Sequence, residues 1–296
     1  MDPQAVLIRS ADSGVRGNSI LGLTTAVGQA ILLAGLTVSW SGQVPAAESQ
    51  APPPIRALMV TGGCCHDYES QKKILSEGIS ARANIVWTIV HEGGDSRTHK
   101  VSLYEDPGWA DGFDVVVHNE CFGAVEDVAF VKRIAAPHRN GLPAVMLHCS
   151  THSYRAAKTD DWRECLGMSS FSHEKRRDLA VVNLAPDHPV MRGFPAVWED
   201  SDDELYKNDK VWPNVTPLAK AFGKDTGRDH VVIWLNHFGK GRVFATTLGH
   251  QNSTMADPVY LALVTRGLLW SCGKLDEDGE PVEGYGPSTA STALPK

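Results

Sequence analysis

The chain has 296 residues and a formal net charge of -7, with 42% hydrophobic and 21% charged residues. This is the composition of ordinary globular proteins, and the length allows one large domain or two small ones with a sizeable core. No basic stripe accompanies the negative net charge, so binding to a nucleic-acid backbone has no electrostatic basis.

The first 46 residues have the pattern of a secretory signal peptide. Arg9 and Arg16 precede an apolar run over 20–40, and small residues follow it. A basic segment, an apolar segment and small residues predict cleavage, here after Ala46 or Ala47. The alternative is an uncleaved membrane anchor, because the run is about long enough to span a bilayer. We therefore expect an exported protein, periplasmic or extracellular, that is free of the membrane once cleaved.

The rest of the chain predicts a linker, one domain and a tail. The linker is Pro-rich and covers residues 47–54, and the domain covers 55–275. Residues 276–296 are rich in Gly, Pro, Ser, Thr and acids, and this composition predicts disorder.

Six cysteines follow the signal segment, and their spacing matches neither a zinc ribbon nor a dense disulfide scaffold. An exported protein could pair them, which leaves disulfide bonding open. A bond between the adjacent Cys64 and Cys65 would be strained. The alternative interpretation is that the cysteines are buried free thiols.

The first half of the domain alternates strands and helices. The expected strands cover 55–60, 85–90, 114–118 and 143–148, and the expected helices cover 68–83 and 124–139. The strands are short apolar runs, and the β-branched run at 115–117 is typical of burial on both faces. This alternation predicts right-handed crossovers and a parallel sheet.

The second half predicts shorter strands and one long helix. The strands are expected at 179–184, 203–206, 217–222, 230–237 and 242–247, and the helix at about 258–270. Gly239-Lys240-Gly241 between the last two strands is a hairpin turn signal. The fold class is therefore α/β, with a mostly parallel central sheet and an added antiparallel hairpin.

Histidines follow four of the expected strands. The polar residues at these strand ends are His66, Asp67, His118, Asn119, Glu120, His148, Cys149 and His250. Ligands of open α/β sheets bind outside the carboxyl ends of the strands. Neutral imidazole binds divalent transition metals, and it also titrates near neutral pH. The pattern predicts a metal-binding or proton-transfer site built on His66, His148 and His250.

The segment Met146–Ser150 resembles the strand-turn-helix elbow that exposes one side chain above a sheet. Either His148 or Cys149 could occupy the exposed point. In the second case a neighbouring histidine would activate Cys149 as a thiolate. The alternative role for Cys149 is that of a small buried apolar residue.

Several motifs, in this order along the chain, resemble the ThuA-like (trehalose-utilisation) family of the class I glutamine amidotransferase-like superfamily. They are Gly62-Gly63, His66-Asp67, His148, Phe171-Ser172-His173, Asp187-His188-Pro189-Val190, Asp203-Glu204-Leu205-Tyr206, Gly239–Val243 and Leu248-Gly249-His250. The resemblance spans about 56–272. It implies a flavodoxin-like three-layer fold and sugar-related metabolism, often in exported bacterial proteins. Amidotransferase relatives place a Cys at the elbow, whereas this chain places His148 there.

The leading hypothesis is an enzyme that acts on a sugar or keto-sugar derivative. Its predicted catalytic residues are His66, His148, His250 and Glu120, and the three histidines are also the candidate ligands of a divalent metal ion. Glu120 could equally be a solvated loop acid. Predicted substrate-binding residues are Asp67, Asn119, Cys149, Tyr206 and His173.

Two other functions stay open. One is a thiol-dependent, amidotransferase-like hydrolase centred on Cys149, and the other is a non-catalytic carbohydrate-binding protein. The second would need an aromatic platform among Trp87, Trp109, Trp162, Trp198, Trp212 and Trp234. In each case the expected partner is a small-molecule sugar, with no nucleic acid and no membrane after cleavage, and a homo-oligomer is compatible with the sequence.

Overall fold

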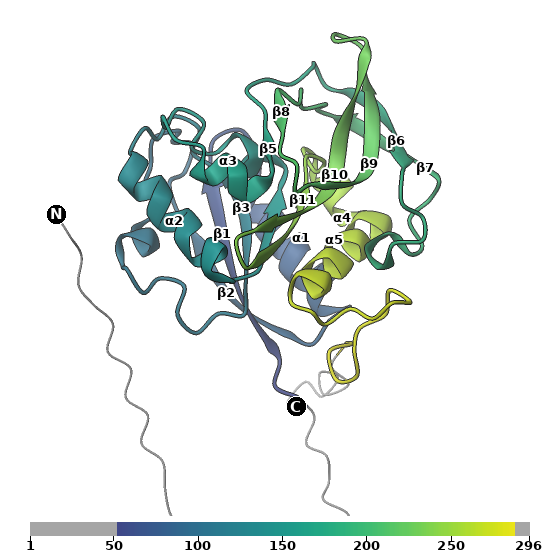
Figure 1. Ribbon diagram of the computed structural model, residues 1–296, viewed down its shortest axis with the longest axis horizontal. Helices are drawn as coiled ribbons and strands as arrows, with labels where there is room; N and C mark the ends of the chain where they lie inside the picture. Colours follow the sequence, from purple (N-terminus) through teal and green to yellow (C-terminus); the bar gives the residue numbers. More distant parts are fainter. Residues whose placement is uncertain (1–51, 288–296) are drawn as a thin grey trace, which may run out of the picture. The chain divides into compact units, whose positions relative to one another are not determined.

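The computed structural model describes residues 52–287. The expected signal peptide and its cleavage site lie outside the described residues. A nine-stranded mixed sheet forms the centre of the domain, and helices cover both of its faces (Figure 1). None of the helices within 52–287 combines the length and the apolar character needed to cross a membrane.

The elements alternate as expected in the first half of the domain. The strands are β1 Ile55–Gly63, β2 Ile85–His91, β3 Val115–Cys121, β4 Ala144–Leu147, β5 Met168–Ser169, β6 Arg177–Asn183, β7 Val197–Asp203, β8 Lys210–Val211, β9 Thr216–Gly223, β10 Arg228–Phe238 and β11 Gly241–Thr246. The α-helices are α1 Tyr68–Ser80, α2 Val128–Asn140, α3 Asp161–Leu166, α4 Asn252–Ala256 and α5 Pro258–Ser271. Short 3-10 turns are η1 Ser102–Glu105, η2 His148–His152 and η3 Pro189–Met191.

The parallel part of the sheet has the order β2-β1-β3-β4-β11. This is the 2-1-3-4-5 order of flavodoxin-like folds, and it confirms the predicted fold class. Alternate residues of β1 enter two cores. Ala57 and Met59 pack with α1 and α5 on one face, whereas Leu58 and Val60 pack with α2 and α3 on the other. These are the three layers visible in Figure 1.

The other part of the sheet is antiparallel and larger than the expected hairpin. β10 and β11 form the hairpin predicted at Gly239, and β9, β6 and β7 continue the sheet beyond it. β5 and β8 form a separate two-stranded sheet. The strand expected at 203–206 is wrong in position, because β7 ends at Asp203. β7 alternates buried Trp198 and Asp200 with exposed neighbours, so it contains no apolar run to recognise.

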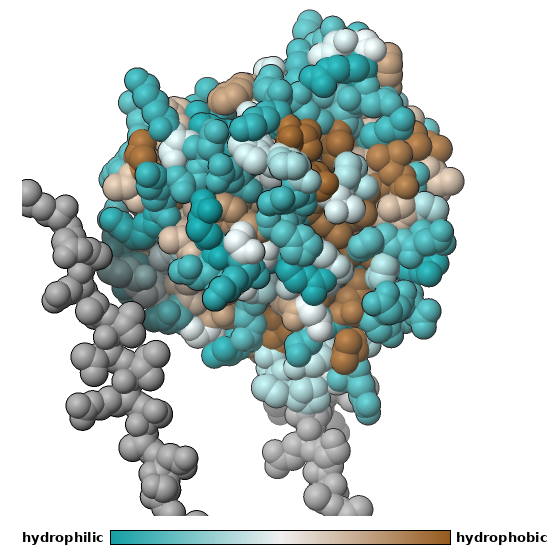
Figure 2. Space-filling model, in the orientation of Figure 1, coloured by the Kyte–Doolittle hydropathy of each residue, from teal (hydrophilic) through white to brown (hydrophobic). Residues whose placement is uncertain are grey.

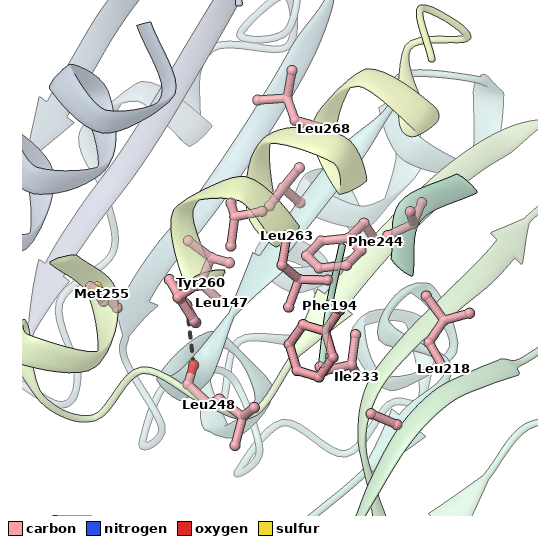
Figure 3. Packing of buried hydrophobic residues seen from close by; sticks show 14 of the residues in the cluster. Leu147, Phe194, Leu218, Ile233, Phe244, Leu248, Met255, Tyr260, Leu263 and Leu268 are labelled. Atoms are coloured by element: carbon pink, nitrogen blue, oxygen red, sulfur yellow. Dashed lines mark hydrogen bonds between the residues drawn. The ribbon is translucent and has the colours of Figure 1, made fainter. Parts of the chain in front are cut away.

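Helix α5 packs across the centre of one face (Figure 3). Leu263 and Leu268 of this helix are buried against the sheet beside Phe244 of β11. The Tyr260 hydroxyl donates to the Leu248 carbonyl at 3.2 Å. The apolar core therefore fixes the segment that leaves β11 and leads to His250.

The beginning of the predicted disordered tail is packed on the domain, as far as the structure describes it. The amide of Val282 donates to the Lys274 carbonyl, and the Tyr285 carbonyl accepts from the Asn84 amide at 3.0 Å. Tyr285 also packs against the core that contains α1 and α5. The expectation of disorder from residue 276 is therefore wrong up to Pro287, because one aromatic side chain anchors an otherwise polar segment.

The surface over the antiparallel part of the sheet differs in polarity from the rest of the molecule. On the face shown in Figure 2, polar residues cover most of the molecule, while apolar residues gather over the antiparallel part. Exposed apolar side chains there include Val197 of β7 and Phe222 of β9.

Candidate functional site

His66 lies in the turn between β1 and α1. Its place depends on Gly63, whose φ of +96° favours glycine and whose added Cβ would lie 2.4 Å from the Cys121 carbonyl oxygen. No other residue could pass so close to the end of β3 without moving it. The Gly62-Gly63 turn thus brings His66 over the carboxyl ends of the parallel strands.

His148 lies at the junction of β4 and η2. Its φ of +41° is in the left-handed region, which costs a non-glycine residue about 1–3 kcal/mol and is common at functional sites. Its Nδ1 lies 2.6 Å from the Thr247 carbonyl oxygen, so Nδ1 carries the proton and donates it. Nε2 is then the acceptor nitrogen, and its lone pair faces the Tyr206 hydroxyl at 3.3 Å.

His250 follows β11 and is held through its backbone. The Asp203 carboxylate accepts hydrogen bonds from the Gly249 amide at 2.7 Å and from the His250 amide at 3.3 Å. Because Asp203 ends β7, the antiparallel part of the sheet positions a histidine at the end of a parallel strand.

The structure brings these three histidines together, as their strand-end positions predict. The ring centroid of His66 lies 4.7 Å from that of His148 and 4.7 Å from that of His250. One ring nitrogen from each residue lies within 4.8 Å of the others. The Nδ1 atom of His66 is buried without a hydrogen-bond partner, and the buried Nδ1 atom of His250 faces only a Glu204 oxygen at 3.4 Å. Unpaired buried nitrogens are costly, and a bound cation would satisfy them.

Burial keeps two of these imidazoles neutral. It lowers the pKa of His66 to about 3, with a further contribution from the neighbouring His148 and His250. It also lowers the pKa of His148 to about 4. Neutral imidazole is the form that ligates metals, so both side chains are competent ligands at neutral pH.

Glu204 is the acidic residue of this group, and it is not among the site residues predicted from the sequence. Its carboxylate oxygens lie 3.4 Å from His250 Nδ1, 3.7 Å from His148 Nε2 and 3.5 Å from His173 Nδ1. Burial alone would raise its pKa, but interactions with His250 and His148 lower the pKa to about 2. The sequence signal for a site role of Glu204 is its place in the motif Asp203-Glu204-Leu205-Tyr206. The same motif is equally compatible with the end of a strand.

His66 and His250 line a cavity of about 550 Å³, whereas the predicted site residue His148 is buried beside them and does not line it. Tyr206 and His152 form one wall, with their rings stacked at 4.0 Å. The Tyr206 hydroxyl lies 3.3 Å from His148 Nε2, and burial holds its pKa well above the usual range, so it remains a hydrogen-bond donor. His173 also lines the cavity. Tyr206 and His173 thus lie where substrate-binding residues are expected.

Three other predicted site residues do not line this cavity. Asp67 is the N-cap of α1, where it accepts the Ser70 amide. Asn119 is buried and donates to Gln71. Glu120 is fully buried and accepts from Tyr104 at 3.2 Å in a separate network. Alternation along β3 turns Glu120 to the opposite face from Cys121, which lines the cavity at the strand end, whereas Asn119 shares the face of Cys121 but is bonded to Gln71 of α1.

The cysteines are only partly as expected. A disulfide joins Cys64 to Cys65, whereas Cys121, Cys149, Cys165 and Cys272 are free thiols, so each of the two alternatives that the sequence leaves open holds for part of the set. Cys149 contributes to the cavity wall but is 6% exposed. Hydrogen bonding to Cys121, then burial, holds the pKa of the Cys149 thiol well above its usual range. A reactive cysteine needs the opposite shift.

The tryptophans do not form a sugar platform at the cavity. None of the residues that line it is a tryptophan. Four of the six candidates, Trp109, Trp162, Trp198 and Trp234, are buried in the cores. The aromatic side chains that line the cavity are Phe171 and Tyr206.

Comparison with known proteins places this architecture in a family. The family model described as "Trehalose utilisation" (ThuA) matches residues 56–271. A ThuA-like protein structure from Parabacteroides merdae has a TM-score of 0.61 at 19% identity and covers 79% of this chain and 96% of its own. One from Bacteroides uniformis has a TM-score of 0.56 at 15% identity, with 80% and 98% covered. These identities show a shared fold, and no curated protein gives a significant match. The family match over most of the chain shows that this protein belongs to the ThuA family.

Proposed function

We propose that this chain is an exported, metal-dependent enzyme that acts on a sugar or keto-sugar derivative. The observation that carries the proposal is the convergence of His66, His148 and His250, with the buried, unpartnered Nδ1 atom of His66. The family description, trehalose utilisation, supports a sugar as the substrate class. The cavity volume of about 550 Å³ lies within the range of small-molecule sites.

The three imidazoles and Glu204 fit a divalent transition metal ion. Neutral nitrogen donors with one carboxylate form a common donor set of zinc and related ions. The Thr247 carbonyl fixes the His148 tautomer, which is the usual outer-shell support of a metal ligand. The bound ion would act as a Lewis acid on a carbonyl or on a pair of hydroxyl groups of the sugar.

The other residues bind and orient the substrate. A carboxylate with a pKa of about 2 is a poor proton acceptor at neutral pH, so Glu204 serves as a fixed negative charge that attracts the cation. The buried Tyr206 hydroxyl stays protonated and can donate a hydrogen bond to a sugar oxygen. His152 supports that ring by stacking on it.

Metal analysis of the purified mature protein tests this proposal. We expect about one divalent ion per chain, loss of that ion in the His66→Ala and His250→Ala variants, and loss of turnover of keto-sugars after chelation. His237→Ala is the matched control, because His237 is exposed and does not line the cavity. Metal-free protein with chelator-independent turnover would refute the metal-dependent function. An intact N-terminus in the exported protein would refute cleavage after Ala46 or Ala47.

The thiol-dependent alternative gives the opposite result. It predicts that Cys149→Ala abolishes turnover while His148→Ala only weakens it. The burial of Cys149 and its raised pKa favour the metal-dependent function instead.

A further inference from the structure

Two arginines line the cavity, and among the described residues neither of them is held there by an ion pair. Arg97 comes from the segment between β2 and β3, and Arg155 follows η2. Within residues 52–287, neither guanidinium has a carboxylate within the 4.0 Å that defines an ion pair. Arg133, by contrast, lies 3.0 Å from Glu105, and Arg177 lies 2.8 Å from Glu174.

Backbone hydrogen bonds hold both arginine segments against the loop after β3. The Ala124 amide donates to the Arg97 carbonyl at 2.9 Å, and the Ala156 amide donates to the Gly123 carbonyl at 3.1 Å. A Cβ on Gly123 would lie 3.4 Å from Arg155 Nε and 3.0 Å from the His152 carbonyl oxygen. The absence of a side chain at position 123 therefore allows Arg155 to lie close to this loop.

Each guanidinium keeps donors free for a ligand. Arg155 Nη1 donates to the Phe171 carbonyl at 3.0 Å, which orients the group and leaves its other N–H bonds without a protein acceptor. Arg97 Nη2 has one weak contact, 3.9 Å from Cys65 Sγ, and Cys65 directly precedes His66. An arginine presents five donors in a rigid fork that matches carboxylate and phosphate groups.

The charge of the cavity walls is positive in a chain of net charge -7. Two guanidinium groups face one carboxylate, since Glu204 is the acidic residue among those that line the cavity. Glu204 lies against the histidines, so it does not neutralise the arginines by direct contact. A concave site of one sign raises the local concentration of ions of the other sign.

We propose that the cavity binds an anionic sugar, with its carboxylate or phosphate group held by Arg97 and Arg155 and its hydroxyl or carbonyl groups facing His66 and His250. As a statement about the substrate class, this inference rests on the proposed function. The shared chemistry is an oxyanion on a polyol, and the source of that oxyanion is either a sugar acid or a sugar phosphate.

Calorimetric titration of the full mature protein tests the inference with three probes of similar size, namely D-gluconate, D-glucose 6-phosphate and D-glucose. We expect at least one anion to bind about 10-fold or more tightly than glucose, and added salt to reduce this preference. Arg97→Gln and Arg155→Gln should each weaken anion binding by about 10-fold and leave glucose binding unchanged. Arg192→Gln, away from this cavity, is the matched control and should behave like wild type.

The result separates the two proposals because metal content is measured on the same samples. Arginine-dependent binding of an anion to a metal-free protein would support this inference and refute the metal-dependent function. Metal-loaded protein without a preference for either anion at millimolar concentrations would overturn the inference alone. An equal loss of affinity in the Arg192→Gln variant, or none in either cavity variant, would also overturn it. The probe that loses more affinity in the cavity variants identifies the source of the oxyanion.

Discussion

Two groups of histidines in this domain have opposite environments. His66, His148 and His250 lie together, the first and last at the cavity, and the buried Nδ1 atom of His66 has no hydrogen-bond partner. His118 and His138 are fully buried, and each of their ring nitrogens has a partner, including a contact of 3.0 Å between the two Nε2 atoms. His118 is expected at the end of its strand, but β3 continues to Cys121, so His118 lies within the strand and is not available to a ligand. The face of the strand, and the partners already present, decide this.

The two groups also differ in what they do for the fold. The His118–His138 pair links β3 to α2 with a partner at every ring nitrogen, so it stabilises the domain, although Oε2 of the neighbouring Glu120 makes no hydrogen bond. The cavity group leaves a buried nitrogen of His66 unpaired, which lowers stability by about 1–3 kcal/mol. Such a cost is characteristic of sites that are completed by a ligand.

The largest expected effect is the loss of metal binding when an imidazole of the cavity group is removed. The His148→Ala variant should lose metal affinity by more than the roughly 10–100-fold that is typical of outer-shell changes, because a direct ligand disappears. His138→Ala should keep its metal and lose stability instead. Zinc titration and elemental analysis of both variants measure the difference, and equal metal content in the two would erase the proposed distinction.

The second expected effect is a pH dependence that belongs to the buried pair. Burial, with a contribution from the neighbouring His118, lowers the pKa of His138 to about 3, whereas a histidine of the unfolded chain titrates near 6.5. Between these values the unfolded chain binds the proton and the folded chain does not. The free energy of unfolding therefore falls as the pH drops from about 6.5 towards 4, by up to about 3 kcal/mol for this one residue.

Urea unfolding of metal-free wild type and His138→Gln at pH 7 and pH 4.5 measures this effect. Glutamine retains a hydrogen-bonding side chain but does not titrate, so the variant should lose less stability on acidification. The other histidines are present in both proteins, so the contributions of those that do not contact His138 cancel in the difference. An identical pH dependence in the two proteins would show that His138 does not titrate as its burial implies.

The third expected effect lies in the support of the cavity group. Asp203→Ala removes the carboxylate that holds the Gly249 and His250 amides, so metal affinity should fall by about 10–100-fold without being abolished. Asp203→Asn retains one acceptor oxygen and should recover part of the affinity. Asp187→Ala is the control, because the Asp187 side chain is 97% exposed. Unchanged metal affinity in Asp203→Ala would show that His250 does not depend on this anchor.

Most of the fold could be predicted from local patterns. The apolar runs of β1 and β3 and the Gly239–Gly241 turn are signals carried by neighbouring residues, and the structure confirms the elements they predict. β7 was misplaced because its burial alternates and its buried positions include the polar Asp200. The packing of Tyr285 on the core was missed for a similar reason, since one anchoring side chain does not change the composition of a segment.

The candidate site was predictable only where its residues follow strands directly. His66, His148 and His250 do so, and the order of strands in a parallel sheet brings such residues to one edge. Arg97 and Arg155 lie in irregular segments, whose path over the sheet depends on tertiary contacts such as the Ala124 amide with the Arg97 carbonyl. Nothing local to either arginine distinguishes it from an ordinary surface cation.

The smallest expected effect compares the same substitution in the two environments. Tyr260→Phe removes one neutral hydrogen bond, to the Leu248 carbonyl, and should lower the free energy of unfolding by about 1 kcal/mol with little change in metal affinity. Tyr104→Phe removes a donor from the buried Glu120 carboxyl group, which is costlier to leave with fewer partners, so about 1.5–3 kcal/mol is expected. Urea unfolding measures both losses of unfolding free energy. A larger loss for Tyr260→Phe would mean that the hydrogen bond beside the His250 segment contributes more to stability than the buried bond to Glu120.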